Sequence, residues 1–100
     1  MQQLLLCVTY TAKHGMREKF VNEIISKGLL DIIHKESGCL GYEYYCSASN
    51  NDEVLLVEQW ETEELQKQHM RQTHMEDLKS IKECYIIDTH LKKFFVTDTD

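Results

Sequence analysis

Residues 54–78 hold the side chains of this chain that are best suited to acid–base chemistry. An apolar run of strand length ends in Glu58 and Trp60, and His69 and His74 follow in two short segments of helical pattern. A carboxylate and two imidazoles within one short stretch can accept and release protons near neutral pH. We therefore expect the active site to be built around these residues.

His74 is the residue that we expect to act as the general base. Thr73 and Glu76 have the spacing of a capping box, which places His74 at the first position of a helix. The positive end of the helix dipole disfavours an imidazolium there, and a neutral ring can accept a proton. The alternative interpretation is an exposed polar residue at a helix start with no part in chemistry.

Glu58 and His69 are the other two catalytic candidates. Glu58 shares a strand face with Val54 and Leu56, and a carboxylate on an apolar face must be paired, protonated or in a cavity. It is therefore either a catalytic group or the ion-pair partner of a lysine or arginine. His69 shares a helical stripe with Leu65, so it is either a catalytic residue or a hydrogen-bonded histidine of the core.

Three aromatic residues are candidates for substrate binding. Trp60, at the end of its strand, is either a platform for a ligand or a part of the core or of an interface. Tyr42 and Tyr44 fall on one face of a predicted strand, where their hydroxyl groups either line a pocket or belong to ordinary strand residues. The sequence does not decide between these alternatives.

The hydrophobic pattern predicts one α+β domain over residues 1–100. A long helix is expected from Met16 to about Lys35, where Gly28 marks either close packing on the sheet or a break. Strands are expected at 3–13, 39–48, 54–60 and 83–96, and helical segments within 62–82. The order β-α-β-β-α-β is that of a ferredoxin-like fold with one four-stranded antiparallel sheet.

The predicted strands are apolar on both faces, which has a consequence for assembly. Leu4 and Leu6 face one side of the first strand, while Leu5 and Cys7 face the other. The helices of this fold can cover only one face of the sheet, and the other face would expose a larger apolar patch than monomers usually do. We therefore expect a homodimer in which two copies pack sheet to sheet.

Composition and motifs exclude several classes of function. The net charge is −6 and the lysines and arginines are scattered, which argues against a nucleic-acid partner. The apolar runs are far shorter than the roughly 20 residues of a membrane span, and the first residues lack the charge of a signal peptide, so we expect a cytoplasmic protein. The cysteines form no CxxC pair, and no HExxH, GxGxxG, phosphate-loop or GxSxG motif occurs. We therefore expect no metal, nucleotide or flavin cofactor.

The residues around the candidate site resemble those of a known family. The resembling residues are Glu58-Gln59-Trp60-Glu61, Leu65, His69, Thr73, His74 and Met75, together with the turn Glu36-Ser37-Gly38-Cys39. They are similar to the antibiotic biosynthesis monooxygenase family, and within it most similar to the small bacterial quinol monooxygenases. The resemblance implies a dimeric α+β barrel of two ferredoxin-like protomers, each with an apolar cavity between its sheet and its helices. It also implies that His74, His69, Glu58 and Trp60 serve the reaction.

The oxygenases of that family use neither metal nor flavin. The deprotonated substrate, a quinol or an anthrone, donates an electron to O2 itself, so a base in an apolar enclosure is sufficient. By this resemblance we expect a cofactor-independent monooxygenase whose partners are O2 and a small quinol or hydroxylated aromatic substrate.

The family also leaves other functions open. It includes the isomerase of phosphorylated autoinducer-2, and a phosphorylated ligand would need cations, for which Arg17, Arg71, Lys92 and Lys93 are available. It includes haem-degrading enzymes too, which have an Asn on the first strand and a Trp in the helix after the third strand. Residues 3–13 contain no Asn and residues 62–72 contain no Trp. A dimeric ligand-binding module without enzymatic activity is the remaining hypothesis.

Overall fold

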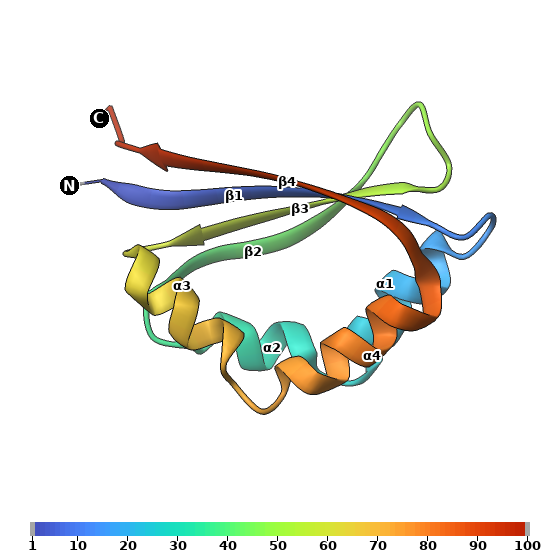
Figure 1. Cartoon of the computed structure of the whole chain (residues 1–100), viewed down its shortest axis with the longest axis horizontal. Coiled ribbons are helices and arrows are strands. Elements are labelled where there is room, and N and C mark those ends of the chain that lie inside the picture. The colour runs from blue at the N-terminus through green and yellow to red at the C-terminus, as the bar shows by residue number, and fades with distance from the viewer. Residues whose placement is uncertain (1, 100) are drawn as a thin grey trace.

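The computed structural model describes residues 2–99, which form four strands and four helices (Figure 1). The strands are β1 (Gln3–Ala12), β2 (Cys39–Cys46), β3 (Glu53–Trp60) and β4 (Ile86–Val96). The helices are α1 (Arg17–Ser26), α2 (Leu29–His34), α3 (Glu63–Met70) and α4 (Met75–Tyr85). The expected ferredoxin-like order is confirmed, with each of the two helical segments divided into two helices.

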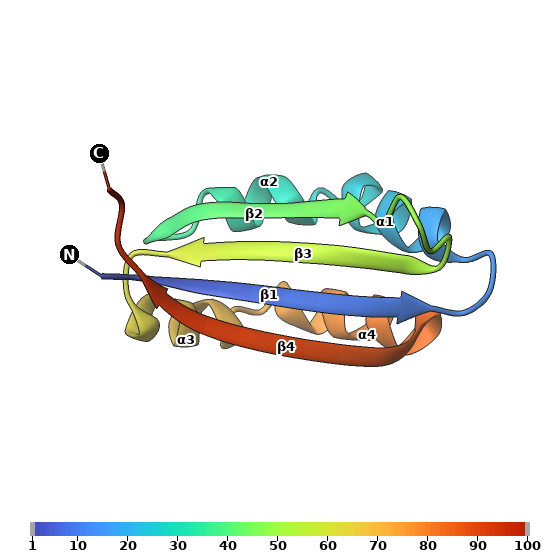
Figure 2. The same cartoon turned by 90° about the horizontal axis from the view of Figure 1, so that it is seen from above.

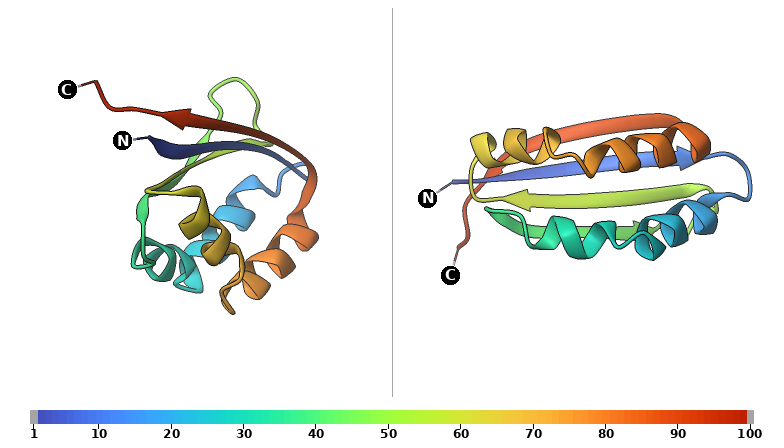
Figure 3. Two further views of the ribbon diagram at one scale, coloured as in Figure 1. Left: turned by 60° about the vertical axis from the view of Figure 1, so that its left-hand side comes forward. Right: turned by 90° about the horizontal axis from the view of Figure 1, so that it is seen from below.

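The sheet is antiparallel, with the strand order β2-β3-β1-β4. All four helices cover one of its faces: α1 and α2 lie on the β2 side, and α3 and α4 lie on the β4 side (Figures 2 and 3). None of the helices in the described part of the chain is long and apolar enough to cross a membrane.

The core lies between the sheet and the helices. Burial alternates residue by residue along β1 and β3, so one face of each strand points toward the helices. The largest fully buried side chains are Trp60, Tyr42, Phe20, Leu4, Ile24, Leu29, Ile33, Leu56, Leu78, Ile81, His69 and Val54. A histidine is therefore part of an otherwise apolar and aromatic core, which requires that its ring nitrogens find partners.

Gly28 breaks the first helical segment. Its φ of 70° lies in the left-handed region, so α1 ends before it and α2 begins after it. A Cβ atom at Gly28 would meet nothing within 4 Å. The backbone conformation, and not close packing on the sheet, therefore explains the glycine at this position.

The N-terminus of α4 differs from the expectation, whereas that of α3 has a side-chain cap. Thr62 caps α3, because its side chain accepts a hydrogen bond from the Leu65 amide. The predicted capping box at Thr73 is wrong: His74 is itself the N-cap of α4, and its side chain makes no capping hydrogen bond. Thr73 contributes only its backbone carbonyl, which accepts from the Glu76 amide. The chain enters α4 through successive backbone turns, so no side-chain cap is needed there.

The boundary between α4 and β4 also differs from the expectation. The fourth strand was expected to begin at Glu83, and this boundary is wrong, because α4 continues to Tyr85 and β4 begins at Ile86. Leu78 and Ile81 bury the apolar face of α4, and this helical packing outweighs the strand preference of the residues that follow.

The face of the sheet opposite the helices is uncovered and apolar. Leu5 pairs with Phe94, and Leu55 pairs with Tyr45, all on this outer face. Tyr45 and Phe94 are exposed, while Leu5 and Leu55 are half-buried between their neighbours. The expected apolar outer face is thus present, and sheet-to-sheet pairing of two copies stays a prediction.

Candidate active site

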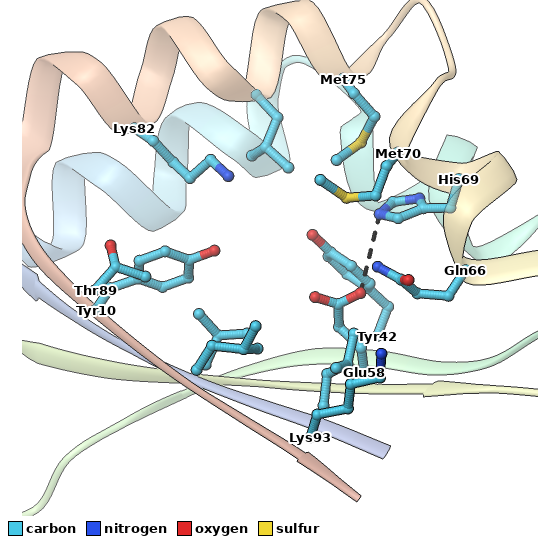
Figure 4. Close-up of a pocket in the computed structure, with 14 residues that line it drawn as sticks. Tyr10, Tyr42, Glu58, Gln66, His69, Met70, Met75, Lys82, Thr89 and Lys93 are labelled. Carbon is cyan, nitrogen blue, oxygen red and sulfur yellow. Dashed lines mark ion pairs between the residues drawn. The ribbon is translucent and has the colours of Figure 1, made fainter. Parts of the chain in front are cut away.

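A cavity of about 260 Å³ lies between the covered face of the sheet and helices α3 and α4 (Figure 4). We call it the inner cavity. Its apolar lining comes from Leu6, Val8, Met70, Met75, Leu78 and Leu91. Its polar lining comes from Tyr10, Tyr42, Glu58, Gln66, His69, Lys82, Thr89 and Lys93. A mostly apolar space with a few convergent polar groups is the usual form of a small-molecule site.

Glu58 points into the inner cavity from the middle of the sheet (Figure 4). It is only 7% exposed, and the indole Nε1 of Trp60 donates a hydrogen bond of 3.1 Å to its Oε1. Burial raises the pKa of Glu58 to about 7, although the Trp60 hydrogen bond and the charge of Lys82 act in the opposite direction. No ion pair links it to a lysine or arginine within the described part of the chain. Glu58 can therefore accept and release a proton near neutral pH.

His69 lies behind Glu58 and is 1% exposed. Its Nε2 is 4.0 Å from Glu58 Oε1, and its Nδ1 donates to Glu36 Oε2 at 2.9 Å. Its ring packs against Trp60 and Tyr42, at centroid distances of 4.6 Å and 5.6 Å. Burial lowers the pKa of His69, and the neighbouring Glu36 only partly offsets this, so the neutral ring is favoured.

Glu36 joins the two histidines of the site. It lies in the turn between α2 and β2, and its Oε2 accepts from His74 Nε2 at 2.8 Å as well as from His69. Glu36 belongs to the turn that resembles the family, but no role is predicted for it from the sequence. An isolated acid in a turn carries no local signal of a contact with a helix more than thirty residues away. The sequence offered only indirect signals of this contact, namely the two nearby histidines and the resemblance of the turn to that of the family.

The position of Glu36 depends on close packing at Gly38. A Cβ atom at Gly38 would lie 2.4 Å from Leu65 Cδ1 and 2.9 Å from Leu65 Cβ. The φ of Gly38 is 81°, which also favours glycine. Helix α3 therefore packs directly on the turn, and this contact brings His69 to Glu36.

The expected site residues fall into two groups. Glu58, His69 and Tyr42 line the inner cavity, whereas Trp60, Tyr44 and His74 do not. Trp60 is fully buried and supports the site through its contacts with Glu58 and His69. Tyr44 packs edge-on against Tyr42, with ring centroids 5.9 Å apart. His74 has a side chain that is 17% exposed and contacts the site through Glu36.

Two lysines, Lys82 and Lys93, line the inner cavity. Of the four cations named from the sequence as possible phosphate ligands, only Lys93 is among them. Lys93 lines the cavity and forms an ion pair with Glu63 at its edge. Arg17 instead donates to backbone carbonyls of the β2–β3 turn, and Arg71 and Lys92 do not line the cavity. Lys82 of α4 was missed; it lines the cavity, and burial lowers its pKa. A phosphorylated ligand would thus meet few free cations among the described residues.

Glu36, His69 and His74 could also hold a metal ion. One ligand atom from each residue lies within 4.8 Å of the other two. A carboxylate with two imidazoles is a common set of ligands for Zn²⁺ and Fe²⁺. Both imidazoles are also satisfied as they stand, because each donates to Glu36.

The model of one protein family, the antibiotic biosynthesis monooxygenases, matches residues 4–80 of the chain. The chain belongs to this family. As a family member it carries Glu36, Glu58, His69 and His74, together with most of the inner cavity, within the matched region. No protein of curated function matches the chain.

Solved structures agree with the antibiotic biosynthesis monooxygenase fold. A protein from Shewanella oneidensis is similar with a TM-score of 0.85 and 19% identity, over 95% of this chain and 91% of that one. A protein from Pseudomonas aeruginosa has a TM-score of 0.84 and 20% identity, over 98% and 97%. A third, from Chloroflexus aurantiacus and provisionally named an antibiotic biosynthesis monooxygenase, has a TM-score of 0.83 and 17% identity, over 98% and 96%. At these identities the likeness shows a shared fold.

Proposed function

We propose that this family member is a cofactor-independent monooxygenase that oxidises a small quinol or hydroxylated aromatic with O2. The observation that carries the proposal is the buried carboxyl of Glu58, which faces a mostly apolar cavity and whose pKa is raised to about 7. Such a group is a proton acceptor suited to the phenolic hydroxyl of a substrate in this cavity.

The proposed reaction starts with proton transfer. Glu58 accepts the proton of a substrate O–H, and the resulting anion transfers one electron to O2. The superoxide and the substrate radical combine at a ring carbon, and the peroxide takes a proton back and loses water. A quinol then leaves as a hydroxyquinone, so that quinol plus O2 gives hydroxyquinone plus H2O. One oxygen atom of O2 enters the product and the other enters water.

Two other side chains support this chemistry. The ammonium group of Lys82 lines the same cavity and stabilises the negative charge that develops on the substrate oxygen. Tyr42 offers a buried hydroxyl as a hydrogen-bond donor, because burial raises the pKa of this group and keeps it protonated. In this proposal Glu58, and not His74, is the general base. His74 contacts the site only through its hydrogen bond to Glu36.

The experiment that tests the function is oxygen uptake with isotopic labelling. Reduced benzoquinols, naphthoquinols and anthrones are supplied under ¹⁸O2 in the presence of EDTA, with a protein-free blank for autoxidation. We expect at least one substrate to be consumed faster than in the blank and to gain one ¹⁸O atom. Uptake at the blank rate across the whole panel would contradict the proposal and favour the ligand-binding module.

A further inference from the structure

His69 lies between two separate spaces and lines both of them. The first is the inner cavity, and the second is a polar outer pocket whose lining includes Glu36 and Ser37. Nε2 of the ring faces Glu58 in the inner cavity, and Nδ1 donates to Glu36 in the outer pocket. Each nitrogen of one imidazole thus serves a different carboxyl group.

Two aromatic side chains pack on the ring and limit its movement. Trp60 packs on His69 with a centroid distance of 4.6 Å, and Tyr42 packs on it at 5.6 Å. Burial and the hydrogen bond to Glu36 oppose rotation of the ring, so the two nitrogens keep their assignments. The exposed fraction of the side chain rises from 1% for His69 to 10% for Glu36 and 17% for His74, so the connected groups lead from the core toward solvent.

We propose that His69 carries protons between Glu58 in the inner cavity and Glu36 in the outer pocket, with His74 holding Glu36 in place. The proposal rests on the proposed function for the source of the proton, which is the substrate hydroxyl. His69 and Glu36 are then positioning and relay residues, and Glu58 is the residue that touches the substrate.

The transfer is balanced in both directions. In the resting state Nδ1–H donates to Glu36, and the lone pair of Nε2 faces Glu58. Once Glu58 has taken the substrate proton, it delivers a proton to Nε2 while the Nδ1 proton moves to Glu36. Glu58 is then a carboxylate again, His69 is neutral in its other tautomer, and Glu36 is protonated. The reverse movement supplies the proton that the peroxide needs, which restores the resting tautomer.

The longest step is the one between Glu58 and His69. Their 4.0 Å separation exceeds a hydrogen bond, so the transfer needs a rotation of the Glu58 side chain or one bridging water. The groups that face His69 are Glu36, Glu58, His74, Tyr42 and, through its charge, Lys82. Burial of the ring lowers the pKa of His69 and so disfavours an imidazolium; the charges of His74 and Lys82 act in the same direction, and Glu36 opposes them.

Glu36→Gln separates a relay from a purely structural role. The amide oxygen of glutamine can still accept hydrogen bonds from both histidines, but it cannot take up a proton. Glu64→Gln, the same change at an exposed position of α3, is the matched control. Glu36→Asp retains a carboxylate and tests for partial recovery, and thermal melts of all three variants report whether each one folds.

The first measurement needs no substrate, so its result does not depend on the proposed function. Exchange of the His69 Nδ1 proton with water is followed by NMR in ¹⁵N-histidine-labelled protein. We expect Glu36→Gln to slow this exchange by about tenfold or more, Glu36→Asp to recover part of it, and Glu64→Gln to leave it unchanged. Unchanged exchange in folded Glu36→Gln would overturn the proposal.

The second measurement uses turnover of a quinol that the wild type oxidises. Glu36→Gln should lower kcat by about tenfold or more at unchanged KM and increase the solvent deuterium isotope effect on kcat. Wild-type kcat and isotope effect in this variant would also overturn the relay. Absence of turnover in the wild type would instead refute the proposed function, and the exchange rates would still decide the relay.

Discussion

The ring of His69 and the carboxylate of Glu36 are joined by a hydrogen bond of 2.9 Å across 33 residues of sequence. This bond ties α3 to the turn between α2 and β2, and it supplies the only carboxylate partner within hydrogen-bond distance of the buried ring in the described part of the chain. The stability of the fold and the arrangement of the candidate site therefore depend on the same pair.

His69→Ala should lower the free energy of unfolding by about 1 to 3 kcal/mol, because it empties a core position and leaves Glu36 with one partner fewer. His90→Ala removes an exposed histidine of β4 and should change stability by less than about 0.5 kcal/mol. Urea unfolding of both variants gives the comparison. Equal stability of the two would show that the buried hydrogen bond contributes nothing.

Gly38→Ala should destabilise the fold more than Gly28→Ala. Both glycines have positive φ, where a non-glycine residue costs roughly 1 to 2 kcal/mol, but only Gly38 lies against Leu65. A double variant with Leu65→Ala should recover part of the extra loss, as a double-mutant cycle would measure. Identical losses at the two glycines would mean that α3 does not pack closely on the turn.

The pH dependence of stability should report Glu58. Its pKa in the folded protein is about 7, against an ordinary value of 4.5, so the folded state binds more protons between these values than the unfolded state. The stability that the protonated group contributes is present below pH 4.5 and is lost as pH rises through about 7. Glu58→Gln removes this dependence, so its stability relative to the wild type should increase between pH 5 and pH 8. The measurement is the free energy of unfolding of both proteins as a function of pH. If the two stability curves run parallel across about that range, the pKa of Glu58 lies near its ordinary value.

Assembly should depend on the outer face of the sheet. We expect a homodimer with an interface larger than about 1,600 Å². Val57→Asp at the centre of that face should give a monomer of 11.8 kDa by light scattering. Ile25→Asp, the same kind of change at an exposed position of α1, should leave the dimer intact. A monomeric wild type at micromolar concentration would contradict the prediction.

Much of the fold could be predicted because burial alternates with period two along β1 and β3 and the helices follow their three-and-four spacing. The same periodicity placed Glu58 on an apolar strand face and His69 on a helical stripe with Leu65, but it left the orientation of Tyr42 open. The start of α4 could not be predicted, because a Thr–Glu spacing fits both a capping box and a backbone turn. Local pattern also could not separate the fully buried Trp60 from a residue of the cavity lining.

Glu36 and Lys82 show what sequence pattern leaves out. Glu36 joins the site only because Gly38 lets α3 pack on the turn, which is a contact between segments distant in sequence. Lys82 looks like a solvent-facing lysine of an amphipathic helix, yet it lies over Tyr10 and lines the inner cavity. Both positions are set by tertiary packing, which no local period encodes.

Oxygen uptake by wild type and Glu58→Gln with the best quinol of the panel tests the central claim most directly. If Glu58 accepts the substrate proton, Glu58→Gln should lower kcat by a factor of about 10² to 10⁴. The wild-type rate should also rise with pH through about 7, as the carboxylate forms. Glu61→Gln, an exposed acid just beyond β3, should retain full activity. Wild-type turnover in folded Glu58→Gln would contradict the claim and return His74 to consideration as the base.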